Sequence, residues 1–259
     1  IKFEFKILNS EMTHSIDSFY SLVCNIEDYK WDDAVLGIGA NGRIKKGVRI
    51  RDNTQVAIKF LDETRISSNF DEKKHFIREI SYLYSINHPY CLTLINYCIN
   101  PFAIITPFME QGSLANFINP SSKNFIHASP TQLMCTIYSI CSTMDAIHSL
   151  GLIHRDLKPD NILMKLNGDY YDAYIADLGS ARIVDQNIDL TECPDGTAYY
   201  QAPESCFSND YTNSVDVYSY GVIFLQYFRY ELELELEGKK VPKRAYSIIN
   251  AIRNGSRYK

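Results

Sequence analysis

The amino-acid sequence predicts an α+β protein in two parts, a small antiparallel sheet with one helix followed by a mostly helical region. Short apolar segments bounded by turn residues predict five strands, at residues 33–38, 43–50, 54–61, 92–97 and 102–106. Apolar side chains recur at the helical period over residues 71–86, which predicts a helix that ends before His88 and Pro89. Strands joined by short turns favour an antiparallel sheet.

The helical character of the later part is clearest at two segments. Ser129 and Pro130 have the residue types of an N-cap and a first-turn position, and an apolar stripe follows them up to Gly151. Residues 215–228 are apolar nearly all round, so we expect this second helix to be buried. A further helix is expected at residues 245–252.

Composition excludes several classes of protein. The chain has 259 residues and a formal net charge of −5, which argues against the basic surface that nucleic-acid binding requires. Its seven cysteines include no CxxC pair, so neither a zinc site nor a disulfide framework is predicted. No segment approaches the roughly 18 apolar residues of a membrane span. These features together predict a cytoplasmic, intracellular protein without a membrane segment; they leave its oligomeric state open.

The two ends of the chain carry less information. Residues 1–7 alternate apolar and charged side chains, which is consistent with a strand, and we interpret residues 1–28 as an N-terminal extension. The first residue is Ile rather than Met, which suggests a fragment of a longer protein. Residues 231–237 alternate Glu and Leu ahead of several Lys and Arg residues. This segment is either a solvated connection or a docking surface.

A glycine-rich turn between the first two strands indicates phosphate binding. Gly37, Gly39 and Gly42 lack a Cβ, so backbone N–H groups there could approach phosphate oxygens. The turn alone could be a plain hairpin. Lys59 on the third strand adds a cation directed at the same phosphates, and a buried lysine needs a partner, which Glu79 in the following helix could supply.

The strongest chemical signal is the segment His154-Arg-Asp-Leu-Lys-Pro-Asp-Asn161, which precedes a short apolar strand. Asp177 follows a second apolar segment. Two carboxylates and an asparagine are thus expected near strand ends in one region. They would supply hard oxygen ligands for Mg²⁺ beside a free carboxylate.

With these motifs in this order, the chain from about Tyr29 to its end resembles the eukaryotic protein kinase family. The resemblance implies a two-lobed fold with a kinase domain at 29–259, divided into an N-lobe at 29–109 and a hinge and C-lobe at 110–259. It also implies that the last C-lobe helices are missing, among them an arginine that would pair with Glu204. That carboxylate is then expected to be buried and unpaired.

The resemblance assigns catalytic roles residue by residue. It implies that Asp156 is the base that accepts or orients the substrate hydroxyl proton, and that Asn161 and Asp177 bind the metal. Lys59, held by Glu79, resembles the lysine that binds the α- and β-phosphates. Lys158 resembles the lysine that steadies the γ-phosphate in serine/threonine kinases.

The ATP pocket also maps onto matching positions. The residues that the resemblance assigns to ATP binding are Leu36, Gly37, Gly39, Gly42, Ile44, Ala57, Lys59, Thr106, Met109 and Leu163. Within this set, Leu36, Ile44 and Ala57 would form the roof over the adenine and Leu163 the floor. Met109 would be the hinge contact.

Other matching segments concern substrate binding and regulation. Residues 196–204 resemble the segment that holds the acceptor peptide, and Asp216 resembles the aspartate that anchors the catalytic loop. Leu178 stands where the family usually has phenylalanine. The candidates for an activating phosphosite are Ser180, Thr191, Tyr199 and Tyr200.

The function predicted on this basis is transfer of the γ-phosphoryl of Mg-ATP to serine or threonine hydroxyls of proteins. A nucleotide-binding pseudokinase or signalling scaffold is the alternative, although the intact set of Lys59, Asp156 and Asp177 argues against it. Dual or tyrosine specificity is a third alternative. It rests on a resemblance of residues 216–221 and Thr106 to the tyrosine-kinase-like group and conflicts with Lys158.

Overall fold

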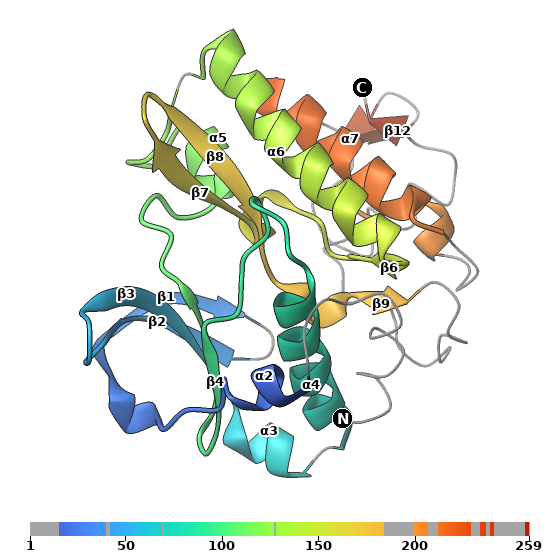
Figure 1. Ribbon diagram of the computed structural model, residues 1–259. Coiled ribbons are helices and arrows are strands. Elements are labelled where there is room, and N and C mark those ends of the chain that lie inside the picture. The colour runs from blue at the N-terminus through green and yellow to red at the C-terminus, as the bar shows by residue number, and fades with distance from the viewer. Residues whose placement is uncertain are drawn as a thin grey trace. The chain divides into compact units, whose positions relative to one another are not determined.

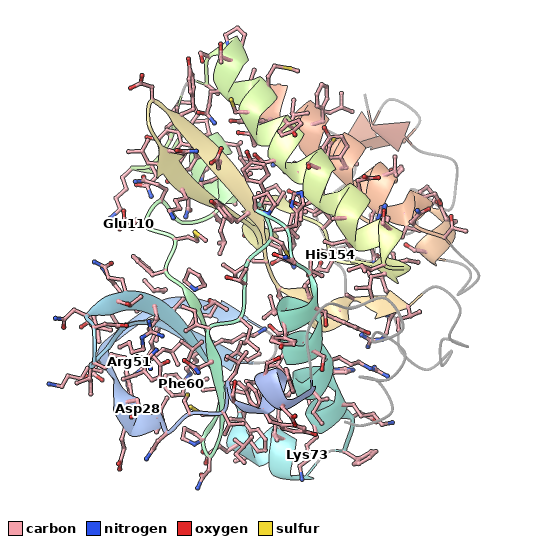
Figure 2. The ribbon with its side chains drawn as sticks, in the orientation of Figure 1. Asp28, Arg51, Phe60, Lys73, Glu110 and His154 are labelled. Carbon is pink, nitrogen blue, oxygen red and sulfur yellow. The ribbon has the colours of Figure 1, made fainter. Side chains whose placement is uncertain are left out.

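Five antiparallel strands form the sheet of the first part of the chain in a computed structural model (Figure 1). The structure describes residues 16–39, 42–68, 70–126, 128–183, 199–206 and 212–228, together with three short strands between 234 and 258. The chain divides into two units, Ile1–Glu110 and Gln111–Lys259, and each is described by itself. Glu110, the last residue of unit 1, is labelled in Figure 2.

The sheet of unit 1 has the strand order β1-β2-β3-β5-β4, with every neighbouring pair antiparallel. The strands are β1 (Tyr29–Gly39), β2 (Gly42–Arg49), β3 (Thr54–Leu61), β4 (Asn96–Ile99) and β5 (Phe102–Pro107). The five-stranded sheet predicted from the sequence is therefore confirmed. The bounds of β3 agree with the predicted segment at both ends.

The two faces of this sheet carry different side chains, and one face forms a buried core. Val56 and Ile58 of β3 and Ile105 of β5 are completely buried and form a core with Tyr29 and Cys98. Successive side chains of a strand point to opposite faces, so the residues between them lie on the other face.

Helix α4 (Phe70–Ser85) confirms the predicted helix. Its side chain Phe76 packs edge-on against Tyr97 of β4 and Phe102 of β5, with ring centroids 6.4 and 5.2 Å away. Two short helices that the sequence did not predict accompany it, α2 (Ile16–Tyr20) and α3 (Glu63–Ser68). Helices of this length have too few apolar positions to show a period.

Residues 16–28, interpreted as part of an extension, pack against β4 and α4 within unit 1. Phe19 is only 2% exposed; its ring stacks on Tyr97 and meets Tyr84 of α4 edge-on, with both centroid distances 5.2 Å. The backbone of Tyr97 exchanges hydrogen bonds with Leu22 and Cys24. A single turn of 3₁₀-helix, Ile26–Asp28, then leads into β1.

We expect Phe19→Leu to destabilise the protein by about 1–2 kcal/mol, because it keeps an apolar side chain but loses two ring contacts worth about 0.5–1.5 kcal/mol each. Urea unfolding followed by tryptophan fluorescence would measure this. The matched control is Phe70→Leu at an exposed site on α4, which loses a cation–π contact with Lys74 and should change stability by only about 0.5 kcal/mol. Equal effects of the two substitutions would contradict the packing role of Phe19.

The predicted strand at 92–97 is wrong at its start. Pairing with β5 begins with Asn96 opposite Ile105, and residues 92–95 are irregular apart from one hydrogen bond from Ile95 N to Ile105 O. Leu92 is buried all the same. The apolar run therefore reflects burial of an irregular segment rather than strand pairing.

The largest elements of unit 2 are two antiparallel helices, α6 (Pro130–Ser149) and α7 (Ser214–Phe228), which run beside each other in Figure 1. Side chains of the two helices meet at two places, Thr136 with Tyr227 and His148 with Asp216. The residue numbers rise along α6 as they fall along α7, so the helices are antiparallel. The predicted cap is confirmed, since Ser129 Oγ accepts from Gln132 N at 3.1 Å and Pro130 opens the helix.

The expectation that α7 is buried is wrong for part of its surface. Val217 is 61% exposed and Leu225 is 43% exposed, whereas Val215, Val222 and Ile223 are buried. An all-apolar segment carries no polar stripe to mark its solvent side, so the sequence pattern could not separate the two faces.

A hairpin of β7 (Ile162–Asn167) and β8 (Tyr170–Ile175) packs against α6. The buried side chain of Gln132 on α6 bonds to both backbone groups of Tyr171, at 2.8 Å through Nε2 and 2.7 Å through Oε1. The smaller elements are α5 (Leu114–Ile118), β6 (Leu152–Ile153), β9 (Arg182–Ile183) and the 3₁₀ turns Pro159–Asn161, Leu178–Ser180 and Glu204–Cys206.

Three short strands, β10 (Leu234–Leu236), β11 (Lys239–Lys240) and β12 (Arg257–Tyr258), form a sheet with β10 in the middle. Part of the Glu/Leu segment is thus strand. The strand expected at 1–7 and the helix expected at 245–252 lie outside the described residues. Among the helices that the structure describes, none is long and apolar enough to cross a bilayer.

Candidate active site

In unit 1, Lys59 and Glu79 form the predicted ion pair. Lys59 Nζ lies 2.7 Å from Glu79 Oε1, and the side chains are 17% and 5% exposed. Lys59 comes from β3 and Glu79 from α4, so the pair also joins the helix to the sheet. A carboxylate this deeply buried is stable as an ion only beside a cation, which Lys59 provides.

Three of the predicted ATP residues of unit 1 share the sheet face that carries Lys59. The register pairs Ile44 with Lys59 across β2 and β3, and Ala57 with Thr106 across β3 and β5. Because alternate residues of a strand share a face, these four side chains lie on one side of the sheet. Ile44 and Ala57 are half-buried, whereas Val56 and Ile58 on the opposite face of the sheet are fully buried.

Leu36 and Met109 differ from these residues in their setting. Leu36 lies at an irregularity in the pairing of β1 with β2 and is 52% exposed. Met109 is buried just after β5, and Leu163 belongs to β7 in unit 2. Gly37 and Gly39 lie at the end of β1.

Gly42, the first residue of β2, is required by close approach of two strands. A Cβ at this position would lie 2.1 Å from the carbonyl oxygen of Phe60 on β3, a distance that no side chain tolerates. The glycine of the predicted phosphate turn therefore also has a packing reason. Ala40 and Asn41 at the tip lie outside the described residues.

In unit 2, three predicted residues meet at one carboxylate. Asp156 Oδ2 lies 2.7 Å from Lys158 Nζ and accepts a hydrogen bond of 3.0 Å from Asn161 Nδ2. The same amide nitrogen donates to the backbone oxygen of Asp156 at 2.8 Å. Two acceptors at Nδ2 fix the orientation of the Asn161 amide and leave its Oδ1 as the atom that can bind a cation.

The β7–β8 hairpin brings Asp177 to the same end as Asn161. Ile162 pairs with Ile175, and Ala176 N donates to Asn161 O at 2.9 Å, so the residues flanking the hairpin stay together. Asp177 is exposed and has φ of 59°, in the left-handed region. This conformation is uncommon for residues other than glycine but is more accessible to Asp, and it turns the chain sharply after β8.

These residues fit a magnesium ion. An amide oxygen and a carboxylate are hard oxygen ligands, and Mg²⁺ is usually held by one or two carboxylates, with phosphate and water completing its shell. No group of three or more His, Cys, Asp or Glu suited to a metal occurs among the described residues.

Asp216 of α7 anchors the loop that carries Asp156. Its carboxylate, 1% exposed, accepts from the backbone N–H groups of His154 at 2.8 Å and Arg155 at 2.9 Å. His148 Nε2 lies 2.9 Å from the same carboxylate, which can only accept, so Nε2 carries a proton. Arg155 has φ of 71°, so these hydrogen bonds hold a strained backbone.

His154, labelled in Figure 2, is completely buried and joins the loop to the segment before Asp177. Its Nδ1 accepts from Asp156 N at 3.3 Å, so Nε2 carries the hydrogen and donates to Ala176 O at 3.2 Å. The motifs predict no role for His148, and none for His154 beyond its place in the segment 154–161. A polar residue in the last turn of a predicted helix was the only signal for His148.

The expectation of a buried Glu204 carboxylate is wrong. Glu204 lies in a short 3₁₀ turn and is exposed, so water can solvate its charge. Of the candidate phosphosites, Thr191 lies outside the described residues. Tyr200 is half-buried, and its hydroxyl donates to Gln226 Oε1 at 2.7 Å; burial raises the pKa of this phenol.

The sequence model of the protein kinase domain matches residues 32–254. This chain belongs to the protein kinase domain family. The kinase domain is 33% identical over 83% of its residues to one Dictyostelium discoideum protein and 32% identical over 74% to another. Both relatives are named as probable serine/threonine-protein kinases. A dual specificity protein kinase of the same organism is 28% identical over 81% of the chain.

The kinase domain spans only part of these relatives. It covers 41%, 11% and 15% of their respective lengths. Members of the protein kinase family use ATP and Mg²⁺ in general.

Proposed function

We propose that this kinase domain transfers the γ-phosphoryl group of Mg-ATP to serine or threonine hydroxyls of protein substrates. The observation that carries the proposal is the contact of 2.7 Å between Lys158 Nζ and Asp156 Oδ2. It puts a cation beside the carboxylate that would meet the acceptor hydroxyl. The names of the two Dictyostelium relatives support the same acceptor class.

In the proposed mechanism, Asp156 accepts a hydrogen bond from the substrate hydroxyl, orients its oxygen toward the phosphorus and takes up its proton as the transfer proceeds. The Asn161 amide holds the carboxylate in place through its hydrogen bond of 3.0 Å. Lys158 is already in contact with Asp156 and would stabilise negative charge on the transferred group. Positioning and charge stabilisation account for most of the catalysis in phosphoryl transfer.

Each unit offers groups that are proposed to bind phosphates or the metal ion. Lys59 would bind the α- and β-phosphate oxygens, with Glu79 limiting where its ammonium group can move. Asn161 Oδ1 and Asp177 would hold Mg²⁺, which neutralises charge on the β- and γ-phosphates when bound. Half-buried Ile44 and Ala57 offer an apolar surface for the adenine.

Glu79→Gln is expected to reduce kcat/KM for ATP about tenfold. The amide keeps the shape of the side chain but replaces a charge-assisted hydrogen bond with a neutral one, a loss of roughly 1–2 kcal/mol in the positioning of Lys59. Steady-state kinetics with varied ATP would measure it. Glu63→Gln, at an exposed position on α3, should leave kcat/KM unchanged. An unchanged kcat/KM for Glu79→Gln would show that the ion pair with Lys59 is not needed for the reaction.

Transfer from radiolabelled ATP to a generic basic protein, followed by phosphoamino-acid analysis, tests the proposal. Phosphoserine and phosphothreonine are expected. Phosphotyrosine would instead support dual specificity, which the name of one relative and the resemblance to the tyrosine-kinase-like group raise. If a longer version of the protein bound Mg-ATP, as shown by a thermal shift, but transferred nothing, the proposal would fail and a nucleotide-binding scaffold would replace it.

The proposal places the domain in a reducing, intracellular compartment. Cys24, Cys91, Cys98, Cys135 and Cys141 are free cysteines, and thiols persist in a reducing compartment.

A further inference from the structure

Two cysteines of unit 1 lie against each other beside the edge strand β4. The Sγ atoms of Cys24 and Cys98 are 3.0 Å apart. Val23 and Tyr97 form a parallel bridge, and Cys24 N donates to Tyr97 O at 3.0 Å. The next residue on each segment of a parallel pair is again opposite its partner, so backbone register itself places Cys24 beside Cys98.

We propose that Cys24 and Cys98 form a reversible disulfide when the protein meets hydrogen peroxide, and that this bond ties the N-terminal segment to β4. The sulfur atoms of a disulfide are about 2.05 Å apart, so they need to approach by roughly 1 Å. Rotation about the Cα–Cβ bonds can provide this while the backbone pairing stays as it is. Both residues also pack on the same sheet core, which keeps the side chains together.

The surroundings of the two thiols decide which one reacts first. Cys98 is completely buried, whereas Cys24 is only partly buried and can meet a small oxidant. The hydrogen bond from Cys98 lowers the pKa of Cys24, although burial and the charge of Asp28 oppose this. The same hydrogen bond raises the pKa of Cys98, which therefore keeps its proton. Thiolates rather than thiols attack peroxides, so Cys24 is the initial nucleophile.

The chemistry balances in two steps. The Cys24 thiolate attacks one oxygen of hydrogen peroxide, the O–O bond breaks, and hydroxide leaves as Cys24 becomes a sulfenic acid. The sulfur of Cys98 then attacks the sulfur of Cys24, the S–O bond breaks, and water leaves with the Cys98 proton. The two sulfurs lose one electron each, and a proton from solvent converts the hydroxide to a second water. A dithiol reductant reverses the result by thiol–disulfide exchange.

Cys91 and Cys141 differ from this pair. Cys91 is buried, and burial raises its pKa to about 12, which makes it a poor nucleophile at neutral pH. Cys141 is exposed on α6 in the other unit and provides a control site.

The bond would strengthen an existing contact between the N-terminal segment and α4. Phe19 already packs on Tyr84 of α4, and the hydroxyl groups of Ser18 and Tyr84 are hydrogen-bonded. A cross-link from residue 24 to residue 98 closes a long loop and restricts the unfolded chain. We expect the melting temperature to rise by roughly 5–10 °C on oxidation.

Peptide mapping of the full chain after treatment with a slight excess of hydrogen peroxide tests the proposal. Trypsin without reductant should release the peptide 7–30, which contains Cys24, joined to a peptide that contains Cys98. Chymotrypsin cleaves after Tyr97 and so separates Cys91 from Cys98. The joined peptides should be lighter by two hydrogen atoms than the separate thiols, and dithiothreitol should release them and reverse the rise in melting temperature.

Matched variants distinguish oxidation of this cysteine pair from oxidation at other sites. Cys24→Ser should abolish both the joined peptides and the rise in melting temperature, and Cys141→Ser should change neither. Peptide mapping of the chain without substitutions tests for the disulfide even if a variant such as Cys98→Ser does not fold. Sulfinic acid at Cys24, a bond to a different cysteine, or two thiols left unmodified would each overturn the proposal.

Discussion

Asp156→Asn is expected to reduce phosphoryl transfer by about 10² to 10⁴-fold, the usual range for loss of a positioned proton acceptor. The amide cannot take the hydroxyl proton and no longer attracts Lys158, whose Nζ lies 2.7 Å from the carboxylate. Its shape is nearly unchanged, so Asn161 can still donate to the remaining oxygen. Lys59, Glu79 and the sheet face proposed for the adenine belong to unit 1, so ATP binding should persist.

Single-turnover transfer at saturating ATP would measure the chemical step, and the thermal shift with Mg-ATP would measure binding. Asp160→Asn is the matched control, because it makes the same change at an exposed position of the same loop and should leave the rate within about twofold. Retention of more than a tenth of the activity by Asp156→Asn would show that the carboxylate is not the proton acceptor or the orienting group.

Sequence periodicity predicted the elements whose local pattern and burial agree. The strand at 54–61 alternates fully buried Val56 and Ile58 with half-buried Ala57 and Lys59, so its period of two was visible. Helix α6 combines an apolar stripe with the cap at Ser129, and both signals point to the same start. Such agreement of independent local signals makes an element predictable.

Predictions from the sequence are wrong where the burial of a residue does not follow from its secondary structure. The run of apolar residues that begins at Leu92 predicts a strand, but Leu92 is buried in an irregular segment. Val217 is apolar but exposed, and nothing in α7 marks the difference. The packing of Phe19 on Tyr84 and Tyr97 joins residues far apart in the chain, and a single sequence carries no local signal for such contacts.

In the candidate site, the sequence predicts the types of the residues but not their arrangement in space. The motifs identified Asp156, Asn161 and Asp177 because their chemistry is unusual for a structural loop. Their arrangement depends on features that no motif reveals, such as the left-handed backbone of Asp177 and the bond from His154 Nε2 to Ala176 O. These contacts hold the loop in a conformation that its own sequence does not favour.

Asp216→Asn is expected to destabilise the protein by about 3–5 kcal/mol. The carboxylate of Asp216 is 1% exposed and is the acceptor for His154 N, Arg155 N and His148 Nε2. An amide offers one oxygen and turns an NH₂ group toward donors, so at least one buried N–H loses its partner and the charge-assisted bonds are lost. Because these bonds hold the positive φ of Arg155, the adjacent Asp156 should also lose its position.

Urea unfolding would measure the loss of stability as a lower midpoint at an unchanged slope. Asp145→Asn, at an exposed position on α6, makes the same chemical change and should alter stability by about 0.5 kcal/mol or less. Because Asp216 would act on catalysis only by positioning the loop, the folded fraction of the variant should show a lower kcat with little change in KM for ATP. A variant with normal stability and normal kcat would show that the three hydrogen bonds to Asp216 do not hold the loop.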